Sequence, residues 1–262
     1  MLRAVSASRY VMPFREGGSV PALVEGDDLG MYVMKLRAAA QGGRALVAEL
    51  LGGEIARAVG LAVPELVMVE LGREIAEAEP DPELAEPLEK SIGTNLGLDY
   101  LPGSLTFDAV AGPKPDPAFA SHAVMVDAFL MNVDRTARNP NLLAWHKRLW
   151  LIDHGAALYV HHGWSPETVL ESAADPFAEV RAHVLLRWAS ELEAAATALT
   201  SAVTPELVDR LVALVPDAWL DEGPYGLFES PAAHRAAYGA FLRARLAAVP
   251  AILEEAKRAR GV

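Results

Sequence analysis

The sequence contains no cysteine, which excludes disulfide bonds and metal sites built from thiolates. Basic residues are also few, with 23 Lys and Arg against 35 Asp and Glu and a formal net charge of -12. General affinity for nucleic acid or anionic membranes is therefore not expected, although local basic patches remain compatible with this balance. No uncharged stretch of about 18 residues suggests a membrane span, and the N-terminus lacks the apolar run of a signal peptide. We expect a cytoplasmic protein that binds neither membranes nor nucleic acid directly.

Apolar residues are abundant, at 52% of a chain of 262 residues, which is enough for a substantial core. The first segment alternates short β-prone pieces with Gly and Asp turns, which predicts hairpins of an antiparallel sheet. From Gly43 to Val59 the apolar spacing is helical, and Gly60 is a natural terminator before "LAVPELVMVEL" returns to a strand. Residues 73–90 are acidic and contain three prolines, which favours a solvated loop or insertion.

Regular structure is interrupted at Pro102 and Gly103, and the long patterns that follow are helical. This change divides the chain into a β-rich N-terminal lobe, residues 1–102, and a mainly helical C-terminal lobe, residues 103–262. The predicted fold class is α+β, with a small antiparallel β lobe that carries one helix and a mostly α-helical large lobe.

The segment "NVDRTARNPNLLAWHKRLWLIDHG", residues 132–155, concentrates polar side chains between apolar runs. We interpret "LLAWHKRLWLID" as two short strands with a turn at His146 and Lys147, so that Asp134, Asn139 and Asp153 meet at one edge of a hairpin. Carboxylate and amide oxygens suit Mg²⁺, and phosphoryl transfer needs that metal together with a carboxylate near the attacking hydroxyl. The alternative is a hairpin whose Asp and Asn side chains only cap neighbouring backbone groups.

These residues resemble a known family. The pattern NxDRxxxN, followed thirteen residues after Asn139 by Ile152-Asp153-His154-Gly155, looks like the catalytic and metal-binding loops of HipA-like kinases. A secondary likeness is to phosphoinositide kinases. "GGSVPALVEGDDLGMYVMKLR" resembles the glycine-containing hairpin and lysine-bearing strand of these kinases, and "AELLGGEIARAVGLAVPE" resembles the helix that follows. The resemblance implies a two-lobed protein-kinase-like fold whose N-terminal lobe binds the nucleotide.

The resemblance also implies roles for individual residues. Asp134 would be the catalytic carboxylate, Asn139 and Asp153 would hold Mg²⁺, and Lys35 would contact the α- and β-phosphates of ATP. The acidic partner of Lys35 is open between two residues. Alignment by the Gly-Leu-x-Val-Pro ending of the helix favours Glu49, whereas helical arithmetic places Glu54 on the apolar face. We prefer Glu49.

Gly17, Gly18 and Ser19 are predicted to form a turn over the phosphates, where backbone N–H groups approach closely because no Cβ intervenes. The alternative is an ordinary hairpin turn. Tyr100, where a further strand leaves the sheet, is the remaining nucleotide-binding candidate. Arg135 and Arg138 flank the proposed catalytic carboxylate and either meet an acidic substrate or form salt bridges, for instance with Asp127.

The leading functional hypothesis is an ATP- and Mg²⁺-dependent kinase that transfers the γ-phosphate to a hydroxyl of a protein or a small molecule. One alternative is a pseudokinase that keeps the fold but transfers no phosphate. Another is a lipid kinase of the phosphoinositide type, which the acidic net charge disfavours. The resemblance also implies an antitoxin-like partner.

Overall fold

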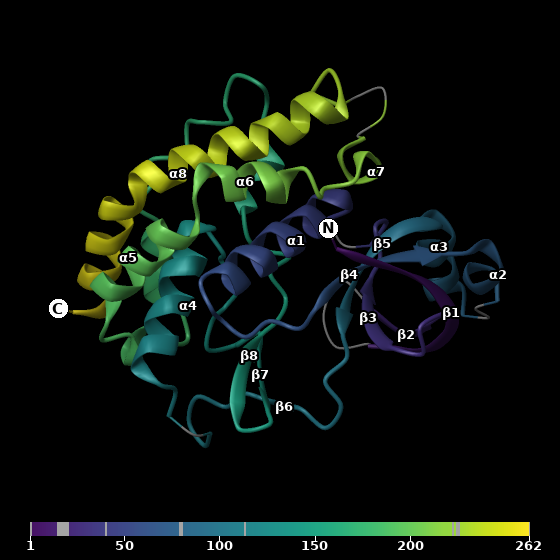
Figure 1. Ribbon diagram of the computed structural model, residues 1–262, viewed down its shortest axis with the longest axis horizontal. Coiled ribbons are helices and arrows are strands. Elements are labelled where there is room, and N and C mark those ends of the chain that lie inside the picture. The colour runs from purple at the N-terminus through teal and green to yellow at the C-terminus, as the bar shows by residue number, and fades with distance from the viewer. Residues whose placement is uncertain are drawn as a thin grey trace.

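The computed structural model has a β-rich lobe and a helical lobe, with helix α1 lying between them (Figure 1). It describes residues 2–14, 21–39, 41–78, 81–112, 114–221, 223 and 226–261. The predicted lobe boundary near residue 102 falls between the last strand of the β-rich lobe and the first strand of the helical lobe.

The β-rich lobe is a closed barrel with strand order β1-β2-β3-β5-β4. Its strands are β1 (Arg3–Pro13), β2 (Ala22–Gly26), β3 (Met31–Lys35), β4 (Leu66–Leu71) and β5 (Gly93–Asp99). The predicted antiparallel pairing is found between β1 and β2, β2 and β3, β3 and β5, and β4 and β5, whereas β1 pairs with β4 in parallel and so closes the barrel. Register shifts along β1 explain this, since such irregularities bend a strand and let its two halves reach different neighbours.

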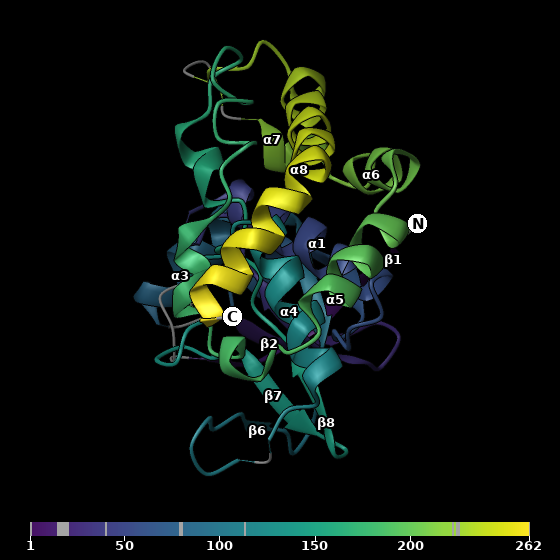
Figure 2. The ribbon, with the colours of Figure 1, turned by 90° about the vertical axis from the view of Figure 1, so that its left-hand side faces the viewer.

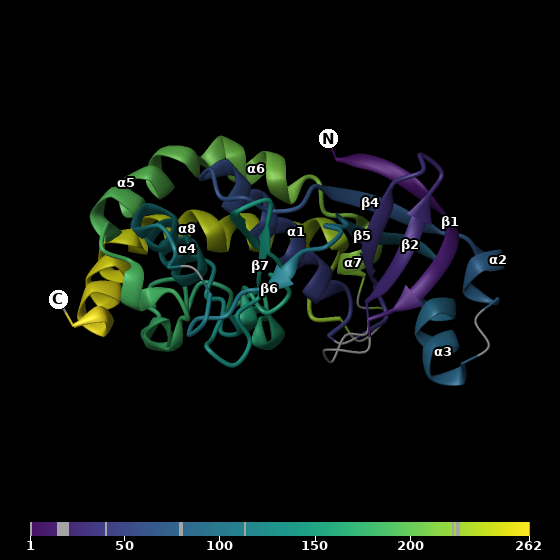
Figure 3. The ribbon, with the colours of Figure 1, turned by 90° about the horizontal axis from the view of Figure 1, so that it is seen from below.

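Residues 73–90, predicted as a solvated loop, instead contain α2 (Arg73–Ala76) and α3 (Pro82–Lys90). Asp81 caps α3 by accepting the Glu83 N–H at 3.1 Å, so Pro82 lies at the start of a helix, where proline is tolerated. Ala76 and Leu88 are buried in the barrel core. Figure 3 shows both helices at the end of the barrel that faces away from the helical lobe.

Helix α1 (Gly43–Ala58) confirms the predicted helix, and Gly60 follows it with a positive φ of 91°. It contacts β4 and β5 on one side and helices of the large lobe on the other. One of these is α7 (Asp217–Leu220). The Trp219 indole donates a hydrogen bond of 2.9 Å to the Thr94 carbonyl of β5, and its backbone lies so close to Gly43 that a Cβ there would clash. A short helix of the large lobe thus touches both α1 and the barrel.

The large lobe contains a small antiparallel sheet and several helices. Its sheet is formed by β6 (Leu105–Thr106), β7 (Leu142–Trp145) and β8 (Arg148–Leu151). Its α-helices besides α7 are α4 (Pro117–Phe129), α5 (Leu192–Ala202), α6 (Pro205–Val212) and α8 (Pro231–Arg260). Part of the chain predicted to be helical after Gly103 is not α-helix, because the 3-10 turns η2 (Ala178–Ala182) and η3 (Leu186–Trp188) precede α5. A further 3-10 turn, η1 (Tyr159–Gly163), lies upstream of both.

Helix α8 runs along the large lobe and contacts α4, α5 and α6 (Figure 2). Its buried Arg245 donates hydrogen bonds to the carbonyls of Ala128 and Phe129, at 2.7 and 3.0 Å, and so caps the end of α4. Within the described residues α8 alone is long and apolar enough to cross a membrane by length and composition. Core helices of soluble proteins share this character, and 44% of its most apolar window is buried inside the protein.

Candidate active site

Lys35 connects three elements of the structure. It ends strand β3, and its Nζ lies 2.5 Å from Glu49 Oε2 on α1 and 2.5 Å from Asp153 Oδ1, which follows β8. Of the two predicted partners, Lys35 pairs with Glu49, whereas Glu54 lies 3.7 Å from Arg57 on the same helix. Helical arithmetic misled here because α1 is buried on several sides, so its charged contact does not have to share the face of its apolar residues.

The charges in this cluster stabilise one another. Burial alone would raise the pKa of the Glu49 carboxyl, but the adjacent Lys35 charge and His154 together outweigh burial and hold this pKa at about 2. Burial also disfavours the Lys35 ammonium, yet Glu49 and Asp153 together raise its pKa above the ordinary value. Lys35 and Glu49 are therefore both ionised at neutral pH, and the ammonium is fixed at the junction of the two lobes.

Behind the cluster, His154 packs against α1. Its Nδ1 lies 3.8 Å from Glu49 Oε1, and within the described part of the chain neither ring nitrogen has a hydrogen-bond partner. A Cβ at Gly52 would come within 2.8 Å of the His154 Cβ. The glycine thus lets the segment that carries Asp153 approach α1. Asp153 itself has a positive φ of 54°, a conformation that Asp tolerates better than most residues.

Asp134 is half-buried in the loop between α4 and β7. Its Oδ2 accepts hydrogen bonds from Asn139 Nδ2 at 2.7 Å and from Asn141 Nδ2 at 3.3 Å. Its backbone N–H donates to Asn132 Oδ1 at 3.1 Å. These contacts fix the direction of the carboxylate. Asn141 was not predicted from the sequence, and the only signal that could have indicated it was its place directly before an apolar strand.

Asp127 on α4 anchors this loop from below. Its buried carboxylate accepts hydrogen bonds from Asn132 Nδ2 at 2.9 Å, Arg135 Nε at 2.5 Å and His183 Nε2 at 3.0 Å. The Leu185 N–H donates to His183 Nδ1, so the proton of the neutral ring lies on Nε2, toward Asp127. Burial would raise the pKa of Asp127, but Arg135 and His183 lower it well below the ordinary range.

The structure distinguishes the two interpretations of Arg135 and Arg138, which were contact with an acidic substrate or formation of salt bridges. Arg135 is buried and also donates to the carbonyls of Asn141 and Ile152, so it fastens the loop to β7 and to the segment before Asp153. Arg138 is exposed on the same loop. Arg135 therefore has a structural role, whereas Arg138 remains on the side of the loop that faces solvent.

The other predicted nucleotide contacts are only partly described. Gly17, Gly18 and Ser19 lie outside the described residues. Tyr100 follows β5, donates its backbone N–H to the Met31 carbonyl at 2.9 Å and places its ring 6.5 Å from that of Phe14. The described contacts do not join its side chain to Lys35.

The candidate metal ligands supply oxygen atoms from two segments. Asp153 is partly exposed, and Asn139, whose Nδ2 is bound to Asp134, keeps its carbonyl oxygen for another contact. The described residues contain no group of three or more His, Cys, Asp or Glu side chains able to hold a metal. The oxygen atoms of Asp153 and Asn139 suit Mg²⁺, which binds through one or two protein oxygens and completes its shell with water and phosphate oxygens.

Comparison with known proteins supports a kinase-like α+β fold. The structure of a Helicobacter pylori proinflammatory kinase, CtkA, superposes with a TM-score of 0.60 at 10% identity, covering 98% of this chain and 99% of that chain. The Golgi casein kinase gives a TM-score of 0.46 at 14% identity, covering 100% of this chain and 75% of that chain. No curated protein matches the chain. The resemblance drawn from the catalytic and lysine-bearing segments is confirmed independently by a family model: the model for HipA-like kinases matches residues 9–232, and the chain belongs to this family.

Proposed function

We propose that the protein is an ATP- and Mg²⁺-dependent phosphotransferase that moves the γ-phosphate of ATP to a hydroxyl of a protein or small molecule. The observation that carries this proposal is the position of Lys35, held between Glu49 of the small lobe and Asp153 of the large lobe. A charged ammonium at this junction is suited to the phosphates of a nucleotide, because it is a compact charge on a flexible stem.

Each proposed site residue has its own role in phosphoryl transfer. Glu49 retains Lys35 when the ammonium turns toward the α- and β-phosphates, and Asp153 then becomes free to hold the metal with Asn139. The Mg²⁺ ion would neutralise charge on the phosphate oxygens. Asp134 orients the acceptor hydroxyl and takes its proton as the hydroxyl oxygen attacks the γ-phosphorus, and ADP leaves with the electrons of the broken P–O bond. Tyr100, and Gly17, Gly18 and Ser19, are proposed to border the nucleotide.

The proposal is tested by ATP turnover and autophosphorylation of wild type and Asp134→Ala. We expect Asp134→Ala to lose activity on the order of a thousandfold, because a positioned base contributes about that much. Asp209→Ala, which changes an exposed carboxylate on α6, is the matched control and should retain wild-type rates. Thermal shifts with ATP should be larger with Mg²⁺ than without it, and Asp153→Ala should lose this difference.

The alternatives give different results in the same experiments. A pseudokinase would show nucleotide-induced thermal shifts but no turnover in either wild type or Asp134→Ala. A lipid kinase would transfer labelled phosphate to phosphatidylinositol vesicles and not to proteins or small hydroxyl compounds. The acidic net charge favours the protein or small-molecule acceptor. A cytoplasmic location and an antitoxin-like partner remain predictions from the sequence.

A further inference from the structure

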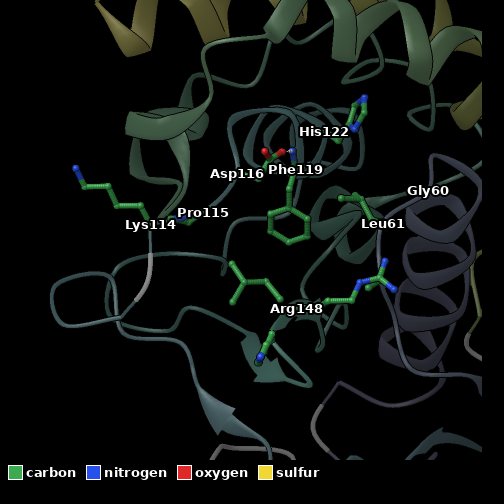
Figure 4. Close-up of a pocket in the computed structure, with 11 residues that line it drawn as sticks. Gly60, Leu61, Lys114, Pro115, Asp116, Phe119, His122 and Arg148 are labelled. Atoms are coloured by element: carbon green, nitrogen blue, oxygen red, sulfur yellow. Dashed lines mark hydrogen bonds between the residues drawn. The ribbon is translucent and has the colours of Figure 1, made fainter.

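A cavity of about 510 Å³ opens where the connection from α1 to β4 meets the large lobe (Figure 4). Three segments form its walls: the connection from α1 to β4, the start of α4 and the tip of the β7–β8 hairpin. The lining residues are Gly60, Leu61, Ala62, Lys114, Pro115, Asp116, Phe119, His122, Lys147, Arg148 and Leu149. None of the residues assigned to phosphotransfer lines this cavity.

The charge of the cavity is opposite to that of the chain. Lys114, Lys147 and Arg148 line it, and in the part of the chain that the structure describes none of them forms a salt bridge. The one carboxylate in the lining, that of Asp116, accepts the Phe119 N–H at 3.0 Å and so caps α4. The cavity therefore has a net positive charge, with three cations against one carboxylate, in a protein whose formal net charge is -12.

The lining also has an apolar part, formed by Leu61, Phe119 and Leu149. In Figure 4, Arg148 lies on one side of the Phe119 ring and Lys114 on the other, with the Lys114 side chain extending away from the ring. A compact anion such as phosphate is bound by donors that converge on one point. Separated cations around an apolar centre instead suit an extended chain that carries carboxylates on both sides of an apolar side chain.

The hairpin tip holds one of these cations in a costly conformation. His146 and Lys147 both have positive φ, 47° and 62°, as the central residues of a two-residue type I′ turn require. Such turns favour Asn and Gly, and a left-handed residue with a Cβ costs roughly 1–2 kcal/mol. Lys147 thus gives up local stability at a position that lines the cavity, which allows a variant that separates binding from folding.

The cavity is connected to the active site through β8. The Leu151 N–H donates a hydrogen bond of 2.8 Å to the Ala62 carbonyl in the cavity wall, and β8 ends two residues before Asp153. A partner bound at the hairpin tip is therefore attached to the strand that positions the proposed metal ligand.

We propose that this cavity docks an acidic segment of a protein partner, with an apolar side chain of that segment over Phe119 and its carboxylates at Lys114, Lys147 and Arg148. The proposal depends on the shape and charge of the cavity and not on phosphotransfer, so binding alone tests it.

The test is fluorescence anisotropy with a labelled synthetic peptide of about twelve residues, rich in Asp and Glu around a central Phe-Leu pair, a length that suits a single docking site. Lys147→Glu/Arg148→Glu should weaken binding at least about tenfold, because each reversed charge replaces an attraction by a repulsion. The matched control, Arg73→Glu/Lys90→Glu, makes the same change in net charge on α2 and α3 and should stay within about twofold of wild type.

A single substitution distinguishes weaker peptide binding from loss of folding. Lys147→Asn suits the left-handed turn better than lysine does, so its melting temperature should equal or exceed that of wild type while its peptide affinity falls. A peptide with Ser in place of Phe-Leu should bind more weakly than the original.

Three results would overturn the proposal. The first is equal peptide affinity of wild type and Lys147→Glu/Arg148→Glu. The second is displacement of the peptide by millimolar inorganic phosphate at constant ionic strength, which would identify a small-anion site. The third is competition by a non-hydrolysable ATP analogue, which would place the peptide in the nucleotide cleft.

Discussion

Asp127 and Arg135 form a fully buried ion pair beneath the loop that carries Asp134, with 2.5 Å between Oδ2 and Nε. The same carboxylate holds Asn132 and His183, so three side chains from two segments depend on one acid. Asp127 thus anchors the loop through Asn132, which accepts the Asp134 N–H, while Asn139 and Asn141 hold the Asp134 carboxylate itself.

Asp127→Asn should destabilise the protein, because it leaves the buried Arg135 guanidinium without a counter-charge. We expect the free energy of unfolding in urea to fall by roughly 3 kcal/mol. Asp209→Asn removes a comparable partner from the exposed pair with Arg243 and should cost less than about 1 kcal/mol. Similar losses in the two variants would contradict the anchoring role of Asp127.

Glu49 predicts a specific response to acid. Its pKa lies at about 2 in the folded protein against 4.5 ordinarily, so its ionised form stabilises the fold in full above pH 4.5. This contribution is lost as the pH falls from 4.5 toward 2, since protonation then breaks the pair with Lys35. The stability difference between wild type and Glu49→Gln, measured by urea unfolding, should shrink across this window. A stability difference that stays constant from pH 4.5 to pH 2 would contradict the ionised pair of Glu49 with Lys35.

Gly52→Ala should displace the segment that carries Asp153. The new methyl group would meet the His154 Cβ at 2.8 Å, and overpacking of this kind costs about 1–3 kcal/mol. Gly72→Ala is the matched control, because nothing lies within 4 Å of the added atom. Thermal unfolding of both variants tests the prediction, and an unchanged melting temperature for Gly52→Ala would refute the close packing of His154 on α1.

Arg245→Lys should weaken the link between α8 and the loop of Asp134. The guanidinium donates to several carbonyls, including those of Ala128 and Phe129, and a lysine ammonium cannot reproduce this planar set of donors. Each unsatisfied buried carbonyl costs about 1–3 kcal/mol, so we expect a clear fall in the urea midpoint. Arg210→Lys, on the exposed face of α6, should leave that midpoint where wild type has it.

The sequence predicted those parts of the fold that local pattern controls. The strand ending at Lys35, helix α1 with its stop at Gly60, and the hairpin turn at His146 and Lys147 all follow from short-range periodicity and turn preferences. The direct contact of Lys35 with Asp153 has no local signal and was not predicted, since the family resemblance gave the two residues only separate roles.

The features of the fold that were not predicted depend on contacts between residues far apart in the sequence. The parallel pairing of β1 with β4 requires a bend in β1 that composition does not indicate, and His183 reaches Asp127 from a segment 56 residues later in the chain. Residues 73–90 were misread because proline was taken as a breaker, although Pro82 stands directly after the N-cap Asp81, where proline starts a helix.

The contact of Trp219 with Thr94 and Gly43 has a consequence for biosynthesis. Because chains emerge from the ribosome N-terminus first, the barrel and α1 are made long before residue 219 exists. Until then α1 and the start of β5 lack a neighbour on which they pack in the finished protein. The lobes are therefore expected to reach their final arrangement together and late, and to unfold in one transition instead of as two separate domains.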